Sequence, residues 1–400
     1  MAVAAASFDR DGVSARPQAA RRLWVERVQL TTFRNYAFAT LDVSATPQIL
    51  IGANGAGKTN LLEAISLLAP GQGLRRVAFP DLAMTGGDGS WSVAARVHSR
   101  LGLVDIGTGQ LAGGNVSARA GRIVRIDGET QSSGALADFV EMVWVTPAMD
   151  GLFTGAGSDR RRFLDRLILC FDPAHGKLAG RFERAMQSRN RLLAEGSRDG
   201  AQLGGFESVM AETGVAIVAA RLEAAAALAE VITARRTRDP LSPFPWCEVA
   251  IEGRLEALLH ARPAVEVEDE YLRLLAKGRE RDRAAGRTLE GPHRSDLVVS
   301  HGPKSCPARI CSTGEQKALL LGLVLAHAEL VASRQDGMAP LLLLDEITAH
   351  LDAARRAALF AEIVRLGAQA WMTGNDAETF SALKERAQFW QVDEARIHPY

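Results

Sequence analysis

Uninterrupted apolar runs mark two candidate strands near opposite ends of the chain. Gln48-Ile49-Leu50-Ile51 precedes a glycine-rich stretch and a helix-like segment, residues 60–65, whereas the apolar residues 340–344 are followed by two carboxylates, Asp345 and Glu346. Apolar runs of this length without alternation are typical of strands that are buried on both faces of a parallel sheet. We therefore predict an α/β fold with a buried parallel sheet.

The chain between these two runs changes its pattern twice. Residues 91–145 contain short alternating runs separated by glycine-rich turns, which predict an antiparallel sheet. From residue 159 to about 238 the spacing becomes helical, with a long segment, residues 206–236, rich in Ala, Leu and Glu. Prolines at 240, 243 and 245 end that segment, and residues 264–286 are a further helical candidate.

These patterns divide the chain into lobes. The first residues, 1–22, have no periodic pattern and are expected to be a disordered extension. Residues 23–150 form the first half of an α/β lobe with its antiparallel sheet, 151–288 an inserted helical arm, and 289–400 the second half of the lobe. Sustained heptads are absent from the insert, so we expect a compact arm and not a long coiled coil.

Composition limits the class of protein. The 400 residues are 47% hydrophobic and 24% charged, which is ordinary for a soluble protein, and the formal net charge of zero neither supports nor excludes a nucleic-acid partner. No uninterrupted apolar stretch approaches the roughly 20 residues that a membrane helix needs. The four cysteines contain no Cys-x-x-Cys pair, so we expect reduced thiols and a cytoplasmic protein without a membrane anchor.

The glycine-rich stretch Gly52-Ala53-Asn54-Gly55-Ala56-Gly57-Lys58-Thr59 is a phosphate-binding loop in the context that such a loop requires, between a strand and a helix. Glycines allow the backbone N–H groups to surround a triphosphate. Lys58 is expected to reach the β and γ phosphates of ATP, and the Thr59 hydroxyl to bind Mg²⁺. The predicted nucleotide contacts in this region are Asn54, Gly55, Ala56, Gly57, Lys58, Thr59 and Asn60.

Asp345 and Glu346 supply the acidic partners of this loop. They stand at the end of the second apolar run, where a parallel strand would deliver them to the nucleotide edge of the sheet. Asp345 is expected to hold Mg²⁺ and Glu346 to orient or deprotonate the attacking water, because phosphoryl transfer depends on positioning and charge compensation. With Lys58, these are the predicted catalytic residues, and two adjacent acids indicate hydrolysis and not binding alone.

A Ser-Thr-Gly-Glu-Gln-Lys motif at residues 312–317 opens a helical stretch and precedes the acidic pair. It resembles the signature of the ABC ATPase superfamily, with Ser312, Gly314, Glu315 and Gln316 as the matching positions. In that superfamily the signature of one subunit caps the nucleotide of the other, which implies a head-to-tail homodimer. Asp352 matches the D-loop, although it is also a candidate N-cap for the next helix.

Three stretches of basic residues are candidates for binding DNA phosphates. Each has an alternative interpretation as a solvated helix face, particularly the last, in which acidic residues are interleaved. The candidates are Arg160, Arg161, Arg235, Arg236, Arg279 and Arg281.

Boxes outside the ATP motifs resemble the RecF family of bacterial recombination-repair ATPases. They are Phe33-Arg34-Asn35-Tyr36, Arg161-Arg162-Phe163-Leu164-Asp165, Arg189 to Leu193 and Gly291-Pro292-His293-Arg294. The resemblance spans residues 25–395 and implies an ABC/SMC-type ATPase head with an inserted helical arm. It further implies an ATP-dependent dimer that binds double-stranded DNA near gaps and works with RecO and RecR to load RecA. Hydrolysis in that family is slow and DNA-stimulated, and by analogy Arg34 would touch the nucleotide.

Some positions depart from the wider superfamily, and some alternatives stay open. Residues 144–150 contain no glutamine to sense Mg²⁺, and Thr373-Gly374-Asn375-Asp376 stands where a switch histidine is expected. Arg34 could instead form an ion pair with a carboxylate. A nucleotide-binding subunit of a membrane complex and a scaffold with vestigial hydrolysis are the alternative functions.

Overall fold

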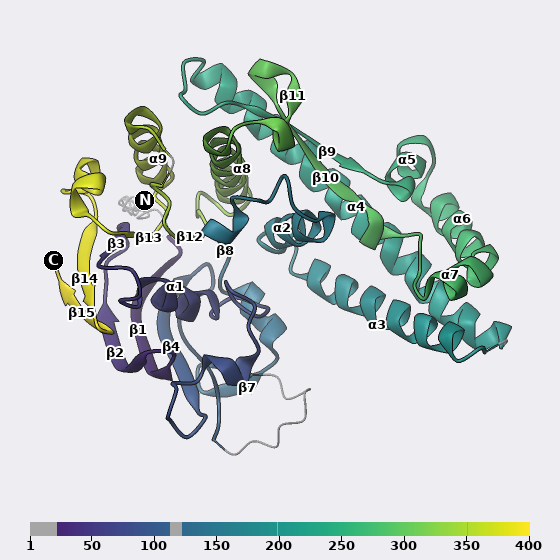
Figure 1. The fold of residues 1–400 in the computed structure, drawn as a ribbon, viewed down its shortest axis with the longest axis horizontal. Coiled ribbons are helices and arrows are strands. Elements are labelled where there is room, and N and C mark those ends of the chain that lie inside the picture. Colours follow the sequence, from purple (N-terminus) through teal and green to yellow (C-terminus); the bar gives the residue numbers. More distant parts are fainter. Residues whose placement is uncertain (1–21, 113–121, 198, 350) are drawn as a thin grey trace, which may run out of the picture.

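The computed structural model describes residues 22–112, 122–197, 199–349 and 351–400. The predicted disordered extension lies outside these residues except for Arg22. The described chain forms an α/β lobe and a helical lobe, which extends away from it on the right of Figure 1. This arrangement confirms the predicted class, a mixed α/β head with an antiparallel subdomain and an inserted helical arm.

A six-stranded central sheet carries the nucleotide motifs. Five of its strands are parallel, and β15 pairs antiparallel with β14 at one edge. The order across the sheet is β15 (Arg396–Pro399), β14 (Gln388–Asp393), β3 (Gln48–Ile51), β13 (Ala370–Gly374), β12 (Leu341–Leu344) and β8 (Met142–Val145). The two apolar runs noted in the sequence are therefore β3 and β12, and they are separated by β13.

The assignment of residues 142–145 to an antiparallel sheet is wrong. These residues form β8, which pairs parallel with β12 at the edge of the central sheet. All four are buried, so they lack the alternation of the strands before them and resemble β12 instead.

A second six-stranded sheet, entirely antiparallel, covers one face of the central sheet. Leu50 of β3 packs toward it, whereas Ile49 and Ile51 point to the other face, as expected for alternating side chains in a strand. Its order is β2 (Tyr36–Asp42), β1 (Trp24–Phe33), β4 (Trp91–Ser99), β5 (Gly102–Gln110), β6 (Ile123–Ile126) and β7 (Glu129–Gln131). The helix α1 (Lys58–Ser66) lies between the two sheets in the same hydrophobic cluster.

The opposite face of the central sheet is covered by α8 (Thr313–Arg334) and α9 (Ala353–Leu366) (Figure 1). By length and composition α8 could cross a membrane, but 83% of its apolar window is buried within the protein. It is the central core helix of the α/β lobe, because its side chains pack against β3, β12 and β13 on one side and α4 on the other.

The arm is built on one long helix, α4 (Gly200–Arg238), which α3 (Ala174–Ala194) accompanies in an antiparallel pair. The single helical candidate at 264–286 is divided at Gly278 into two helices. A three-stranded sheet that the sequence did not predict joins the arm to the α/β lobe, because β9 pairs with β10 from the returning chain. The remaining elements are α2 (Gly157–Leu169), α5 (Arg254–Ala261), α6 (Ala264–Lys277), α7 (Arg279–Ala285), β9 (Cys247–Glu252), β10 (Asp296–His301) and β11 (Cys306–Pro307).

Candidate nucleotide-binding site

The loop between β3 and α1 has the backbone geometry of a phosphate cradle. Gly55 and Gly57 have φ angles of 84° and 120°, which favour glycine. A Cβ at Gly52 would lie 2.1 Å from the Val392 carbonyl oxygen, and one at Gly57 would lie 2.8 Å from the Tyr36 hydroxyl. Conformation favours glycine at Gly55, lack of space requires it at Gly52, and both reasons apply at Gly57. Asn54 and Gly55 are exposed at the tip of the loop.

Lys58 is buried beneath this loop and held by three oxygen acceptors. Its Nζ donates to the carbonyls of Gly52 at 2.5 Å and Ala53 at 2.9 Å, and to Asn375 Oδ1 at 3.1 Å. Burial lowers the pKa of Lys58, and the nearby carboxylates of Glu346 and Asp345 oppose this shift. The ammonium therefore lies beside the loop backbone, with acidic groups on its other side.

Thr59 and Asp345 form an oxygen-only edge next to the loop. The Thr59 hydroxyl donates to Asp345 Oδ1 at 3.0 Å, and the Thr373 hydroxyl donates to the same oxygen at 2.8 Å. Hydroxyl and carboxylate oxygens are the ligands that Mg²⁺ prefers, and Mg²⁺ typically takes only one or two of them from a protein. The residues present therefore fit the predicted metal.

Glu346 has a backbone conformation that aims its side chain outward. Its φ is 47°, an uncommon value for a residue with a side chain, and its N–H donates to Thr373 Oγ1 at 2.7 Å. The Lys317 ammonium donates to its carbonyl at 3.3 Å. As a result the Glu346 carboxylate is exposed in a cavity that also contains Thr59 and Asp345.

The Phe33-Arg34-Asn35-Tyr36 box supports the phosphate loop through hydrogen bonds to its carbonyls. The Tyr36 hydroxyl donates to the Gly57 carbonyl at 3.1 Å, the Asn35 amide donates to the Ala56 carbonyl at 3.3 Å, and the Asn60 amide donates to Asn35 Oδ1 at 2.7 Å. Asn60 thus contacts the box through its side chain.

The Arg34 guanidinium is engaged within the protein in this structure. It forms a two-point ion pair with the buried carboxylate of Glu63, at 2.9 and 3.0 Å, and donates to the Asp81 carbonyl. The ion-pair alternative is therefore what the structure contains. A contact between Arg34 and a nucleotide stays a prediction.

The signature motif forms the N-terminus of α8 and faces solvent. Ser312 caps the helix, and a capping box links it reciprocally to Glu315, whose carboxylate also pairs with Lys304. These contacts lower the pKa of Glu315 to about 2, with the Lys304 hydrogen bond as the largest cause. Gln316 donates to the Cys311 carbonyl, and Gly314 lies in the first turn. Among the described residues, none of the four hydrogen-bonds to the phosphate loop of its own chain.

Asp352 begins α9 as its N-cap. Its carboxylate accepts the Arg355 N–H at 2.8 Å, as the sequence alternative anticipated. The carboxylate is more than half exposed, so the cap leaves a surface on which a second subunit could pack, and the D-loop role stays a prediction.

Most of the DNA-binding candidates are engaged in ion pairs inside the protein. Arg160 forms a two-point pair with Asp296 at 2.7 Å, Arg161 donates to the Ser295 carbonyl, and Arg279 pairs with the buried Glu207. These contacts join α2 to β10 and α7 to α4.

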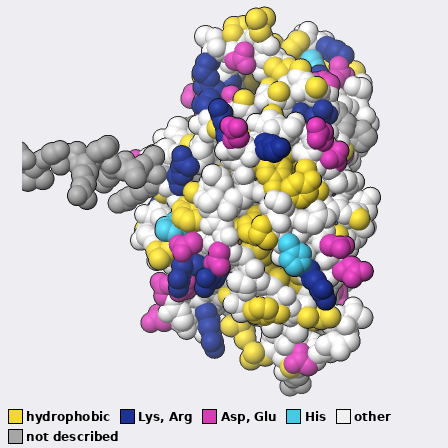
Figure 2. Space-filling model, turned by 90° about the vertical axis from the view of Figure 1, so that its left-hand side faces the viewer, with side chains coloured by type: hydrophobic (Ala, Val, Ile, Leu, Met, Phe, Trp, Pro, Cys, Tyr) yellow, Lys and Arg dark blue, Asp and Glu magenta, His cyan; other side chains and the backbone are white. Residues whose placement is uncertain are grey.

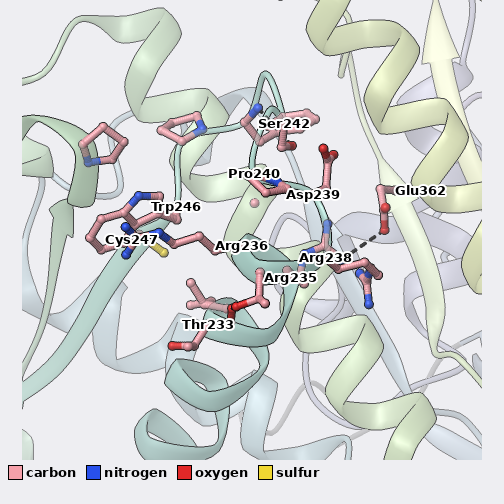
Figure 3. A pocket seen from close by; sticks show the side chains of 16 residues that line it. Thr233, Arg235, Arg236, Arg238, Asp239, Pro240, Ser242, Trp246, Cys247 and Glu362 are labelled. Carbon is pink, nitrogen blue, oxygen red and sulfur yellow. Dashed lines mark hydrogen bonds and ion pairs between the residues drawn. The ribbon is translucent and has the colours of Figure 1, made fainter.

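Arg235 and Arg236 lie at the end of α4 beside a cavity of about 620 Å³, shown in Figure 3. Arg235 Nη1 lies 2.9 Å from Glu329 and 3.1 Å from Glu362, whereas Arg236 extends toward Trp246 and stacks on its ring at 4.3 Å. Arg281 is largely exposed but its Nη2 pairs with Glu290 at 3.2 Å, so of Arg236 and Arg281 it is Arg236 for which no carboxylate partner is found among the described residues. On the face in Figure 2, basic side chains lie interspersed with acidic ones and form no continuous stripe.

Sequence reasoning missed Thr373, Asn375 and Lys317 as members of the site. Thr373 and Asn375 stand at the carboxyl end of β13, between the two strands whose ends carry the recognised motifs. Their position at the end of an apolar run could have indicated that they belong to the site, because the carboxyl ends of parallel strands lie at one edge of the sheet. Lys317 lies within the motif at 312–317, and in addition to Glu346 it faces Asp150 at 3.5 Å.

A phosphate loop, an acidic pair at the end of another strand of the same sheet and a signature motif at the exposed N-terminus of α8 define an ABC-type ATPase head. Residues 24–397 match the family model of the RecF/RecN/SMC N terminal domain. The chain is 54% identical over 376 residues to the "DNA replication and repair protein RecF" of Mesorhizobium japonicum, covering 94% of this chain and 97% of that protein. It is 50% identical to the protein of the same name from Brucella suis, over 97% and 98% of the two chains. The chain belongs to the RecF family.

Solved structures show the same fold. The "recombination mediator protein RecF-ATP in RecFOR pathway" superposes with a TM-score of 0.82 at 20% identity, covering 96% of this chain and 100% of that one. An Smc head domain from Pyrococcus furiosus gives a TM-score of 0.53 at 16% identity, over 94% and 96% of the two chains.

Proposed function

We propose that this protein is a DNA-binding ATPase of recombinational repair that works as an ATP-driven, head-to-tail dimer. One observation carries the proposal. Lys58, Thr59, Asp345 and Glu346 converge at one edge of the central sheet. The helix cap Ser312 of the same chain is exposed and, among the described residues, makes no hydrogen bond to that edge. A second copy would bring its own signature to the open side of the nucleotide.

The roles of the chain's residues follow from their positions. The loop N–H groups and Lys58 would bind the β and γ phosphates, and Thr59 and Asp345 would hold Mg²⁺, which compensates phosphate charge when bound. Glu346 projects into open space beside this edge, where it would orient a water molecule and accept its proton. The α8 N-terminus of the partner, with Ser312 and Gly314, would add N–H donors to the γ-phosphate.

We infer that duplex DNA near single-strand gaps is the macromolecular ligand, and that RecO and RecR are the partners through which the protein promotes RecA loading in the cytoplasm. The names of the full-length relatives support the repair role. Slow, DNA-stimulated hydrolysis would reset the complex. The same relatives argue against the alternative of a membrane-transport subunit, since their matches cover 94% and 97% of this chain.

Exchange of Glu346 for Gln tests whether the site is a working ATPase. We expect turnover to fall by about two orders of magnitude or more, because a general base contributes roughly 10²–10⁴-fold. ATP binding should persist, so the ATP-bound dimer should accumulate on duplex DNA. The exposed Glu385→Gln provides a matched control. Equal turnover in Glu346→Gln and wild type would instead favour the nucleotide-gated scaffold.

A further inference from the structure

Thr59 and Asp345 form what we call the metal edge, where Mg²⁺ would bind. A cavity of about 560 Å³ lies between this metal edge and a group of arginines. Thr59, Asp345 and Glu346 line one part of it, and Arg76, Arg162 and Arg166 line another. Arg75 also borders this space, but its guanidinium donates to Asn60 at 2.8 Å and pairs with Glu63. The other three arginines are considered below.

The three arginines converge from two segments of the chain. Arg76 follows α1 and has a φ of 60°, in the left-handed region. Arg162 and Arg166 are four residues apart on α2, so their side chains share one face of that helix. Like charges at this spacing destabilise a helix. Their juxtaposition therefore has no evident benefit for folding.

The carboxylates nearby neutralise this group only in part. Arg162 pairs with Asp159, but within the described ranges neither Arg76 nor Arg166 has an ion-pair partner. Arg166 is held by stacking, with its guanidinium 3.3 Å from the centre of the Trp144 ring. Burial, and then the charge of Arg76, lower the pKa of Arg166 to about 9. Burial and then Arg162 lower the pKa of Arg76 in the same way.

A phosphate dianion would relieve this repulsion. Guanidinium groups donate several hydrogen bonds in a fixed plane that matches phosphate oxygens, and charge-assisted bonds of this kind are stronger than neutral ones. The cavity is large enough for such an ion together with water. It also adjoins the place where the γ-phosphate would be released.

We propose that Arg76, Arg162 and Arg166 form a phosphate-binding site, which receives the inorganic phosphate produced at the metal edge before it leaves the protein. The assignment as a product site rests on the proposed ATPase function. The site itself does not require turnover, so it can be tested separately.

Calorimetric titration of the nucleotide-free, full-length protein with inorganic phosphate tests the site. Arg162→Gln and Arg166→Met should each weaken phosphate binding by about tenfold or more, as expected for loss of a charge-assisted hydrogen bond. The exposed Arg125→Gln on β6 should leave it unchanged. Arg162 is 45% exposed, so its variant will fold even if loss of the Trp144 stack destabilises Arg166→Met.

The phosphate loop is a second place where phosphate could bind, and Lys58→Met separates the two. If phosphate binding disappears in Lys58→Met and is unchanged in Arg162→Gln and Arg166→Met, the proposal is overturned. Binding that survives in Lys58→Met and weakens in the arginine variants supports it. ATP affinity, measured with a fluorescent analogue, should stay within about twofold of wild type in Arg162→Gln, because its charge lies outside the loop.

A competition with a short duplex identifies the source of the phosphate. For a product site, the duplex should not displace inorganic phosphate, and phosphate release in a single turnover should change in Arg162→Gln. Displacement by the duplex, together with weaker duplex binding by Arg162→Gln, would mean that the arginines bind DNA phosphates and would overturn the product role. If Glu346→Gln and wild type show equal turnover while phosphate still binds, the proposed ATPase function fails and the anion site stands.

Discussion

Thr373 connects the two acidic residues of the nucleotide edge. Its hydroxyl donates to Asp345 Oδ1 at 2.8 Å and accepts the Glu346 N–H at 2.7 Å. Because the hydroxyl is fully buried, both partners would lose a hydrogen bond without gaining water if it were removed. Thr373 thus acts as a positioning residue, which keeps Asp345 toward Thr59 and Glu346 in its left-handed conformation.

Exchange of Thr373 for Val tests this positioning role. Valine has nearly the same shape, so we expect the fold to persist, while ATP turnover falls about tenfold through a loss of roughly 1–3 kcal/mol of hydrogen bonding. The Mg²⁺ concentration for half-maximal turnover should rise. Thr130→Val on the exposed strand β7 is the control. Wild-type magnesium dependence in Thr373→Val would contradict the assignment.

At the residue scale, contiguous motifs were predictable and scattered positions were not. Lys58, Thr59, Asp345 and Glu346 could be assigned because loop, strand and acidic pair are local patterns. Thr373 and Asn375 enter the site only through the order of strands in the sheet. Arg34 lies in a recognisable motif, but the sequence does not reveal that its ion-pair partner is Glu63.

At the scale of elements, the arm is held together by a buried ionic cluster around Arg189 of α3. Its guanidinium is fully buried and bonds to Glu207 of α4 at 3.0 Å, to Asp282 of α7 at 2.8 Å and to the Leu275 carbonyl of α6 at 2.8 Å. Four helices therefore meet at one side chain, and neither acidic partner can reach water.

Exchange of Arg189 for Met should destabilise the arm strongly. Removal of Arg189 leaves the buried carboxylate of Asp282 without its ion-pair partner, which costs roughly 3–5 kcal/mol. Glu207, in contrast, keeps its pair with Arg279. Arg181→Met on the same helix removes a pair with Glu212 in which both side chains are about half exposed, and should cost about 1 kcal/mol or less. Chemical denaturation measures the loss of unfolding free energy in both variants. Equal effects of the two exchanges would contradict this account of the cluster.

His327 of α8 makes the α/β core sensitive to acid. It is fully buried and its Nε2 donates to the Leu167 carbonyl of α2 at 2.8 Å, while burial lowers its pKa from 6.5 to about 4. As the pH falls, His327 therefore binds a proton at a higher pH in the unfolded chain than in the folded one. The stabilising contribution is therefore complete above pH 6.5 and is lost between pH 6.5 and about 4, to a total of about 3 kcal/mol.

The exchange His327→Gln keeps a donor and removes the titration. We expect the free energy of unfolding to fall less steeply with acid in this variant, by about 1.4 kcal/mol per pH unit at most. Denaturant titrations at pH 7.5, 6 and 5 measure the difference. Parallel curves for wild type and His327→Gln would contradict a buried, neutral histidine.

Elements with strong periodicity were predictable, and elements defined by distant pairing were not. The long helix α4 and the strands β3 and β12 follow from composition and apolar runs. The predicted helix is divided at Gly278 into α6 and α7, and Asp282 of α7 pairs with Arg189 of α3, a contact that local periodicity does not show. Strand β9 exists through its pairing with β10 from the other side of the insert, which no local pattern shows.

At the scale of the molecule, the proposed dimer divides the nucleotide site between two copies of the chain. The phosphate loop and the metal edge are assembled, whereas Ser312 and Asp352 face solvent as helix caps. The sequence predicted the lobe order, because the motifs appear on either side of a helical insert. It could not predict that the arginines of the arm region are largely neutralised, since their partners are far away in the sequence.

The most direct test is the molecular mass in solution, by light scattering, of wild type, Lys58→Met and Ser312→Arg, with and without ATP, Mg²⁺ and a gapped duplex. We predict that wild type doubles its mass from 42.9 kDa and retains DNA only with ATP. Lys58→Met should stay a monomer and lose DNA retention because its loop cannot hold ATP. Ser312→Arg should do the same because its helix cap cannot approach the phosphate of a partner. If mass and DNA binding are the same in all three proteins regardless of ATP, the composite site is contradicted.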